Sequence, residues 1–361
     1  MKTNRMGSVV VGLSVLTVLA ACEDPTRPAE PSLTSPAPEV AALHRQFTIR
    51  DLGTFGGDEA GALGINERGE VVGFAQRASG EIRAFIWRPG QGKRNLGTLG
   101  GVESRARAIN DRSEVAGQSL IPSDVSRAFL WTEAGGMRDL GTLGGESSAG
   151  WGINNRGEVV GNSANPNGRD RAFLWRPGRG MRSLGTLGGR ASIAFGINDA
   201  TQVVGSSETA DGSTHAFLWT AAGGMEDLGT LGGLNSEASA ISETGVVVGT
   251  SDTDAGTSEA FLWTREGGMR SLGTLGKHLS SGAQAVNTHQ RVAGSAGPII
   301  PILWTPEHGM RRLPTLAGGQ GFPRHMNEFG QIVGFSTNEA GTVRAALWTP
   351  IEGPFVVAGS K

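Results

Sequence analysis

Tryptophan returns at a constant spacing along most of this sequence. It stands at Trp87, Trp131, Trp175, Trp219 and Trp263, 44 residues apart, and then at Trp304 and Trp348. Leucine keeps the same step from Leu52 to Leu272. Periods of roughly 20–50 residues are typical of solenoids, propellers and other repeat arrays. The spacing therefore predicts a chain built from seven copies of one supersecondary unit.

The third copy, which contains Trp175, shows the internal plan of a unit. Short runs of strand-forming residues alternate with turn residues, so we expect four strands, named A to D along the chain. They cover residues 150–154, 158–161, 172–175 and 181–185. The turn Asn155-Arg156-Gly157 favours a tight hairpin between strands A and B, because Gly adopts positive φ at no steric cost.

Strand C discriminates between architectures. Its residues Ala172, Phe173, Leu174 and Trp175 are all apolar. A sheet with one wet face would alternate apolar and polar side chains, so this run indicates that both faces are covered. Blades that stack side by side meet that condition, and four strands in about 44 residues match one propeller blade. We therefore predict an all-β fold in which residues 46–361 form a seven-bladed β-propeller of four-stranded antiparallel blades.

The two ends of the repeat region predict how the ring closes. Residues 47–53 read as a strand D with no strands A, B and C before it. The last unit, residues 322–348, has strands A to C, but its D-like tail at residues 353–357 is weak. We expect residues 47–53 to complete this last blade.

The repeated glycines and tryptophans are assigned to structure. We expect the tryptophans to fill the core between blades. One glycine ends each predicted strand B, where positive φ or a close backbone approach is expected. These glycines are Gly73, Gly117, Gly161, Gly205, Gly249, Gly294 and Gly334.

The first 45 residues predict export and anchoring. Lys2 and Arg5 precede an apolar run from Val9 to Leu19, the pattern of a secretory signal peptide. The run Leu19-Ala20-Ala21-Cys22 resembles the lipobox of bacterial lipoproteins, which implies a lipid on Cys22 and a signal peptide over residues 1–21. Residues 22–45 are rich in Pro and predict an extended tether. The alternative is an ordinary signal peptide with a chance cysteine.

The repeat units resemble the HAF repeat, a family of probable extracellular repeats in bacterial proteins. Its name stands here as His215-Ala216-Phe217, and its Asp-Leu-Gly-Thr-Leu-Gly-Gly signature covers residues 139–145 and 227–233. The resemblance spans residues 50–349 and implies a location outside the cytoplasm, with no settled activity. The sixth unit departs from it, because Pro298, Pro301 and Leu313-Pro314-Thr315 enter, so we expect a distorted blade there.

The two rims of the predicted propeller differ in how far their loops vary. The A–B and C–D turns share one rim and look alike from copy to copy, whereas the B–C and D–A connections share the other rim and differ. Varied loops on a uniform scaffold often carry function, so we predict a binding face on the B–C/D–A rim; unselected variation is the alternative. Its candidate residues are Asp58, Glu59, Glu103, Glu146, Trp151, Asp170, Asp211, Asp252 and Asp254.

Two further groups of residues suggest ion-binding sites. Arginines before strand C suggest a ring for an anionic ligand, because a guanidinium matches carboxylate or phosphate; pairing with neighbouring blades is the alternative. The ring would contain Arg83, Arg127, Arg171, His215 and Arg344, and Glu259 interrupts it. Asp252, Asp254 and Glu259 offer oxygen ligands for calcium, although they lack the spacing of a known calcium loop. We expect no other metal or cofactor.

The net charge and the cysteine count argue against two classes of protein. The net charge is −2 and there is a single cysteine, so the sequence shows neither the basic stripe of a nucleic-acid-binding protein nor a disulfide framework. We expect a monomeric, non-catalytic binding module at the outer membrane or cell surface, with a protein or glycan partner. The alternatives are a propeller hydrolase or lyase that acts on extracellular glycans, and a purely structural surface protein.

Overall fold

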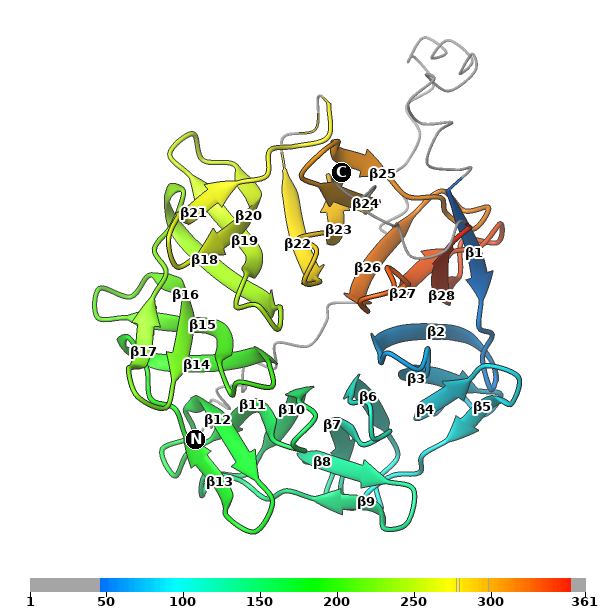
Figure 1. The fold of residues 1–361 in the computed structure, drawn as a ribbon. Helices are drawn as coiled ribbons and strands as arrows, with labels where there is room; N and C mark the ends of the chain where they lie inside the picture. The colour runs from blue at the N-terminus through cyan, green and yellow to red at the C-terminus, as the bar shows by residue number, and fades with distance from the viewer. Residues whose placement is uncertain (1–45, 277, 279, 298, 352–361) are drawn as a thin grey trace, which may run out of the picture. The chain divides into compact units, whose positions relative to one another are not determined.

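Seven four-stranded antiparallel sheets follow one another around a ring in the computed structural model of the chain (Figure 1). The structure describes residues 46–276, 278, 280–297 and 299–351. The seven sheets and their order confirm the predicted seven-bladed β-propeller. The described part of the chain contains no helix with the length and apolar character needed to cross a membrane.

Each blade runs from an inner strand A to an outer strand D. The A strands are β2 (Gly56–Ile65), β6 (Ser104–Ile109), β10 (Ser148–Ile153), β14 (Gly188–Ile197), β18 (Gly232–Ile241), β22 (Ser281–Val286) and β26 (Gly321–Met326). The B strands are β3 (Val71–Arg77), β7 (Val115–Leu120), β11 (Val159–Ala164), β15 (Val203–Thr209), β19 (Val247–Thr253), β23 (Val292–Ala296) and β27 (Ile332–Thr337).

The outer half of each blade is made of strands C and D. The C strands are β4 (Ile82–Arg88), β8 (Ser126–Thr132), β12 (Asp170–Arg176), β16 (Thr214–Thr220), β20 (Ser258–Thr264), β24 (Ile300–Thr305) and β28 (Val343–Pro350). The D strands are β5 (Gly92–Asn95), β9 (Gly136–Asp139), β13 (Gly180–Ser183), β17 (Gly224–Asp227), β21 (Gly268–Ser271), β25 (Gly309–Arg312) and β1 (Phe47–Asp51). Blades 1 to 7 are numbered from β2–β5 to β26–β28 with β1.

Blade 7 joins the two ends of the described chain. Strand β1 pairs antiparallel with β28, with Ile49 opposite Trp348. The prediction that residues 47–53 complete the last blade is confirmed. Because the first strand of the chain supplies the outer strand of the last blade, the ring closes through backbone hydrogen bonds and leaves blade 7 with a full sheet.

Apolar side chains fill the interface between each pair of neighbouring blades. Between blades 2 and 3, Phe173 and Trp175 pack with Ala128 and Leu140, and seven such clusters follow one another around the ring. The tryptophan of the repeat is at most 7% exposed in every blade, so its predicted place between blades is confirmed. Burial of one such side chain contributes about 2–3 kcal/mol.

The A–B turns adopt the predicted conformation. Gly157 has a φ of 75° and donates its N–H to the carbonyl of Asn154 at 3.0 Å. Ser113, Thr201 and Gln290 take the same positive φ where the repeat lacks Gly. This turn therefore holds its shape with or without Gly, although it costs a non-Gly residue some strain.

Blade 6 keeps all four strands despite its altered sequence. Strands β22 to β25 pair in order, and Pro301 lies in the ladder opposite Ser295. The expected distortion of the sheet is therefore absent from its described strands. Pro314 has a role of its own, because its carbonyl oxygen accepts a 2.6 Å hydrogen bond from the indole of the fully buried Trp348. Pro298 lies outside the described residues.

Candidate binding site in the central channel

The seven A strands enclose a hollow on the axis of the ring, which we call the channel cavity. Its volume is about 360 Å³, and its lining comes from the A strands and the A–B turns. Figure 1 shows these strands, such as β6, β10 and β22, nearest the centre of the ring. Concave sites of this size are where proteins hold small ligands.

Every A strand carries a β-bulge at the same position of the repeat. In β10 the pairing with β11 shifts between Gly150 and Gly152, so Trp151 is the extra residue. The other six A strands shift at the equivalent point. A bulge frees one residue from the ladder and re-aims its side chain. The extra residue of every blade lines the channel cavity.

We call these seven bulged residues the channel ring. From blade 1 to blade 7 they are Leu63, Arg107, Trp151, Phe195, Ser239, Gln284 and Arg324. Their chemistry ranges from aliphatic through aromatic to cationic, and the position two residues earlier, which holds Arg105 and Glu237 among others, also varies. The second and third residues after the bulge are nearly constant, as Ile, Val or Met and then Asn or Ser. Variable positions in a uniform frame are the pattern expected where a scaffold presents side chains to a ligand.

A glycine of strand B faces each bulge. A Cβ atom added to Gly161 would lie 1.9 Å from the carbonyl oxygen of Ala149, and the glycines of the other blades are as tightly covered. The predicted close backbone approach is confirmed. The prediction that these glycines end strand B was wrong, because β11 continues to Ala164 and Gly161 lies inside it.

Arg107 and Arg324 place positive charge in the wall of the cavity. The Nε atom of each is buried without a hydrogen-bond partner, and neither forms an ion pair with a carboxylate of the described residues. Burial lowers the pKa of Arg107 to about 9, helped by the charge of Arg324, and burial lowers the pKa of Arg324 to about 10. Both guanidinium groups stay protonated at neutral pH.

Trp151 and Phe195 form an aromatic wall beside Arg107. Their rings meet edge to face with centroids 5.6 Å apart, and the Arg107 guanidinium lies 4.2 Å from the indole centroid. The indole N–H donates to Asn162 at 2.8 Å, and Asn162 in turn donates to Asp170 at 3.0 Å. These bonds hold the indole in one orientation.

Two titratable side chains of the cavity occur in one blade each. Glu237 of blade 5 is open to water within the channel but surrounded by protein, and this reduced solvation raises the pKa of its carboxyl. His325 of blade 7 stands where the other blades have Gly or Ala. Burial lowers the pKa of His325, and its Nδ1 has no hydrogen-bond partner.

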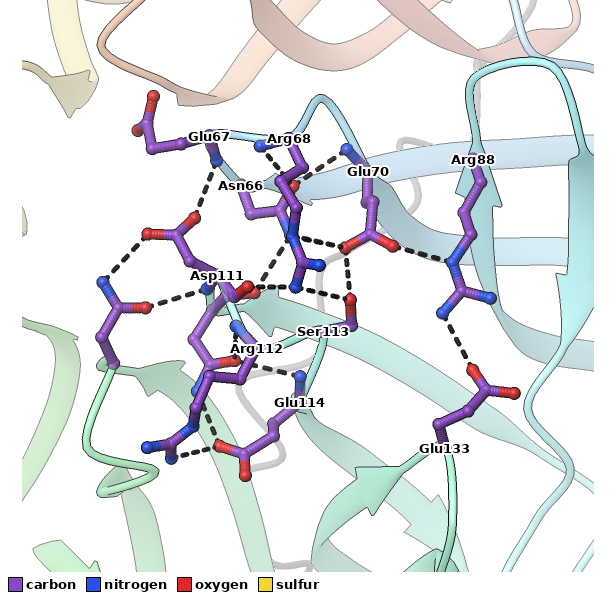
Figure 2. Close-up of polar contacts among 12 residues, drawn as sticks. Asn66, Glu67, Arg68, Glu70, Arg88, Asp111, Arg112, Ser113, Glu114 and Glu133 are labelled. Atoms are coloured by element: carbon purple, nitrogen blue, oxygen red, sulfur yellow. Dashed lines mark hydrogen bonds and ion pairs between the residues drawn. The ribbon is translucent and has the colours of Figure 1, made fainter.

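The A–B turns surround one end of the cavity with a second ring, which we call the mouth ring. It contains Glu67, Asp111, Asn155, Asp199, Glu243, Thr288 and Glu328. Figure 2 shows how the members join: Asp111 accepts the backbone N–H of Glu67 at 2.9 Å. The Glu67 carboxylate in turn accepts the N–H of Glu328 at 3.1 Å, which joins blade 7 to blade 1.

The mouth ring concentrates negative charge. Desolvation raises the pKa of Glu67, and its carboxylate neighbours Glu328 and Asp111 raise it further. Desolvation likewise raises the pKa of Glu243, with Asp199 adding to the effect. The channel therefore presents hydrogen-bond acceptors at its mouth and cations deeper inside.

Buried glutamates below the mouth tie blades together. Glu158 accepts from Asn154 at 2.8 Å, from Thr201 of the next blade at 2.7 Å, and from Arg176 at 2.6 Å. Desolvation opposes ionisation of Glu158, but these hydrogen bonds outweigh it and lower its pKa. Glu70 of blade 1 has the equivalent set of partners, which includes Arg88 of its own blade and Ser113 of the next blade (Figure 2).

The candidate residues of the B–C/D–A rim do not converge. Trp151 alone among them lines the channel cavity, and Asp170 is joined to it through Asn162. Glu103 pairs with Arg105 at 2.6 Å. The others make local contacts or are solvent-accessible: Asp58, Glu59, Glu146, Asp211, Asp252 and Asp254. The binding role of this rim stays a prediction.

Four of the five residues in the suggested arginine ring have local partners, whereas the Nε of Arg127 is buried without a hydrogen-bond partner. Arg83 pairs with Glu81 at 3.0 Å and Arg344 with Asp51 at 2.9 Å, while His215 bonds Asp227 at 2.8 Å. Arg171 bonds backbone carbonyls of Asp170 and Arg190. None of these residues, nor Arg127, lines the channel cavity. These contacts favour pairing within and between blades over a shared anion site.

No group of three or more His, Cys, Asp or Glu side chains with the geometry of a metal site occurs in the part of the chain that the structure describes. The suggested calcium ligands are engaged elsewhere: Asp252 accepts from Ser258 at 2.7 Å, and Glu259 accepts from Ser271. Cys22, the predicted lipid site, lies outside the described residues.

Of the seven channel-ring residues, only Trp151 was among the predicted binding residues. A signal was available, since each channel-ring residue follows Ala, Gly or Pro in strand A and stands two residues before Ile, Val or Met. A bulge is not visible in a period-two pattern, so the inward orientation of this position could not be read directly.

Some proteins of known structure share the fold of this chain. No family model matches the chain, and no curated protein matches it. Among solved structures it is similar to a catalytically inactive virginiamycin B lyase from Staphylococcus aureus with quinupristin, at a TM-score of 0.55 and 12% identity over 84% of this chain and 99% of that one.

Two further structures extend this comparison. A puromycin hydrolase matches at a TM-score of 0.55 and 14% identity, over 90% of this chain and 57% of that one. TolB from Acinetobacter baumannii matches at a TM-score of 0.48 and 13% identity over 84% of this chain, which spans 65% of TolB. At such identities the first two likenesses show the propeller fold alone.

Proposed function

We propose that this protein is a non-catalytic binding module of the bacterial cell envelope, and that its ligand occupies the channel cavity. The observation that carries the proposal is the channel ring. Seven bulged residues at one repeat position face the same cavity, and they bring cationic, aromatic and polar side chains together there.

The channel cavity replaces the B–C/D–A rim as the primary site in this proposal. Its side chains point into one hollow, whereas the rim residues belong to separate blades and bond locally. A glycan suits the cavity, because aromatic faces stack on sugar rings while amides and carboxylates accept their hydroxyl protons.

Export and anchoring belong to the same proposal. The lipobox at Leu19–Cys22 and the resemblance to HAF repeats support a lipoprotein held at the outer membrane or cell surface. Replacement of Cys22 by Ala should move the protein from the membrane fraction to the soluble fraction, and metabolic labelling with a radioactive fatty acid should mark the wild type only. Labelling of Cys22→Ala would contradict the anchor.

A glycan-binding screen tests the channel as the site. The full-length protein, solubilised in detergent, should retain labelled cell-envelope glycans, and Trp151→Ala should reduce retention at least tenfold, since one stacked ring contributes about 1–3 kcal/mol. Arg171→Gln is the matched control on the rim. Equal retention by the wild type and Trp151→Ala would refute the channel as the binding site.

A hydrolase or lyase that acts on extracellular glycans is the second candidate function. Glu237 and His325 favour it, because a carboxylate and an imidazole each occur at these repeat positions in one blade only. Glycosidases usually need two carboxylates flanking the scissile bond, and among the described residues Glu237 is the carboxylate near the level of the channel ring. Release of reducing ends from a polysaccharide panel, abolished by Glu237→Gln, would establish this function instead.

A further inference from the structure

Arg107 and Arg324, the cationic part of the channel ring, form no ion pair with a described carboxylate, although Glu237 of the same cavity attracts Arg324 at longer range. Arg107 and Arg324 lie on either side of blade 1, and each hydrogen-bonds only an amide oxygen: Arg107 bonds Gln118 at 3.4 Å, and Arg324 bonds Gln284 at 3.2 Å. Each keeps a buried Nε–H without a partner. A buried donor left in this state costs stability unless a ligand satisfies it.

The aromatic part of the ring adjoins this charge. Trp151 and Phe195 follow Arg107 in ring order, and hydrogen bonding through Asn162 fixes the indole. An indole face packs against the apolar face of a ring compound and leaves that compound's polar substituents free. The Arg107 guanidinium lies 4.2 Å from the indole centroid, so a cationic group and an aromatic group meet at one wall of the cavity.

The positions of the charges along the channel set a third requirement for its ligand. Arg107 precedes Asp111 of the mouth ring by four residues of the same strand and turn, so the two rings lie up to roughly 13 Å apart. A ligand that fits both rings carries its anionic group inward and hydroxyl groups outward, where carboxylates such as Asp111 and Glu67 accept their protons.

We propose that the channel cavity binds an acidic sugar, with the carboxylate between Arg107 and Arg324 and the sugar ring against Trp151. This inference rests on the proposed function and names its ligand class. A guanidinium fork matches the two oxygens of a carboxylate, and a cavity of about 360 Å³ holds one or two sugar rings. The hydroxyl oxygens of a neutral sugar also accept N–H donors, but they bring no negative charge to the two guanidinium groups.

Titration of the full-length protein in detergent with four probes tests the inference. D-galacturonate and D-galactose differ in the carboxylate, while benzoate and inorganic phosphate carry an anion without a sugar. Galacturonate should bind at least tenfold more tightly than galactose, as one charge-assisted hydrogen bond contributes enough for that ratio. Benzoate or phosphate binding as tightly as galacturonate would overturn the sugar assignment.

Matched variants locate the carboxylate. Arg107→Gln and Arg324→Gln should each weaken galacturonate binding roughly tenfold or more and weaken galactose binding much less, so that the preference for galacturonate falls. Arg107→Lys, which keeps the charge but lacks the fork, should retain part of the preference, and Arg171→Gln removes one charge from the rim as the control. Thermal melting confirms that each variant is folded.

The outcomes separate this inference from the proposed function. Galactose binding equal to that of galacturonate, with both lost in Trp151→Ala, would overturn the acidic sugar and leave the channel as a glycan site. Galacturonate binding that survives in Arg107→Gln and Arg324→Gln also overturns it. Absence of any sugar or envelope-glycan binding overturns both.

Discussion

Two tryptophans of blade 3 experience opposite constraints. Trp175 lies between blades 2 and 3, is 3% exposed, and has a counterpart in every copy of the repeat. Trp151 lies on the bulge of β10 and faces the channel cavity, and no other blade has Trp at this position. The interface between blades admits one solution because it is close-packed, whereas the channel tolerates many because it is hollow.

The largest effect expected from this comparison is on stability. Trp175→Ala should cost about 4 kcal/mol of unfolding free energy, since it leaves a large cavity between two blades. Trp151→Ala should cost about 1 kcal/mol, because the indole is only half-buried at the wall of the cavity. Urea denaturation monitored by circular dichroism gives both values, and equal losses would remove the distinction between interface and channel.

The second test concerns the glycine opposite the bulge, where the backbones of strands A and B approach closely. Gly161→Ala should cost about 3 kcal/mol, because the new methyl group would meet the carbonyl of Ala149 and the bulge must move. Gly178→Ala is the control: Gly178 has a φ of +72° but nothing within 4 Å of an added Cβ, so about 1 kcal/mol of backbone strain is expected. A loss at Gly161 no greater than that at Gly178 would mean that the bulge is not held in place.

Acid titration tests the bonds that join blades below the mouth. The pKa of Glu158 is lowered in the folded state, so its contribution is present above the usual pKa of about 4.3 and is lost as the pH falls through the lower, folded value. Glu158→Gln should cost about 2 kcal/mol at pH 7 and progressively less below pH 4. Glu114→Gln, at the same repeat position but paired with an exposed arginine, should cost under about 1 kcal/mol.

The smallest effect concerns the mouth ring, where Asn155 already replaces a carboxylate in blade 3. Asp111→Asn keeps an acceptor for the N–H of Glu67 and removes one repulsive charge. It also loses the oxygen that accepts from the Asn155 amide at 3.0 Å, but that amide keeps Asp199 as an acceptor at 3.1 Å. Because the pKa of Glu67 is raised, stability present at low pH is lost as the pH rises through the folded pKa. The variant should gain about 0.5 kcal/mol over the wild type at pH 7 and nothing at pH 4. An equal difference at both pH values would show that repulsion is not the cause.

The sequence predicted more of the fold than of the site. Side chains such as Phe173 and Trp175 recur because each must fill the same space between blades, so the repeat, the four strands and the closing role of residues 47–53 could be read from spacing and polarity. The channel ring could not, because a bulge depends on pairing with the neighbouring strand. The position of Arg107 relative to Trp151 likewise depends on which strands line the axis.

Local sequence thus determined the unit, and tertiary structure determined what the unit displays. The period of 44 residues and the apolar strand C are enough to define a blade, because burial between blades acts on every copy alike. Only closure of the ring brings seven separate strands around one axis, and only then do Arg107, Trp151 and Arg324, residues distant in the chain, line one cavity.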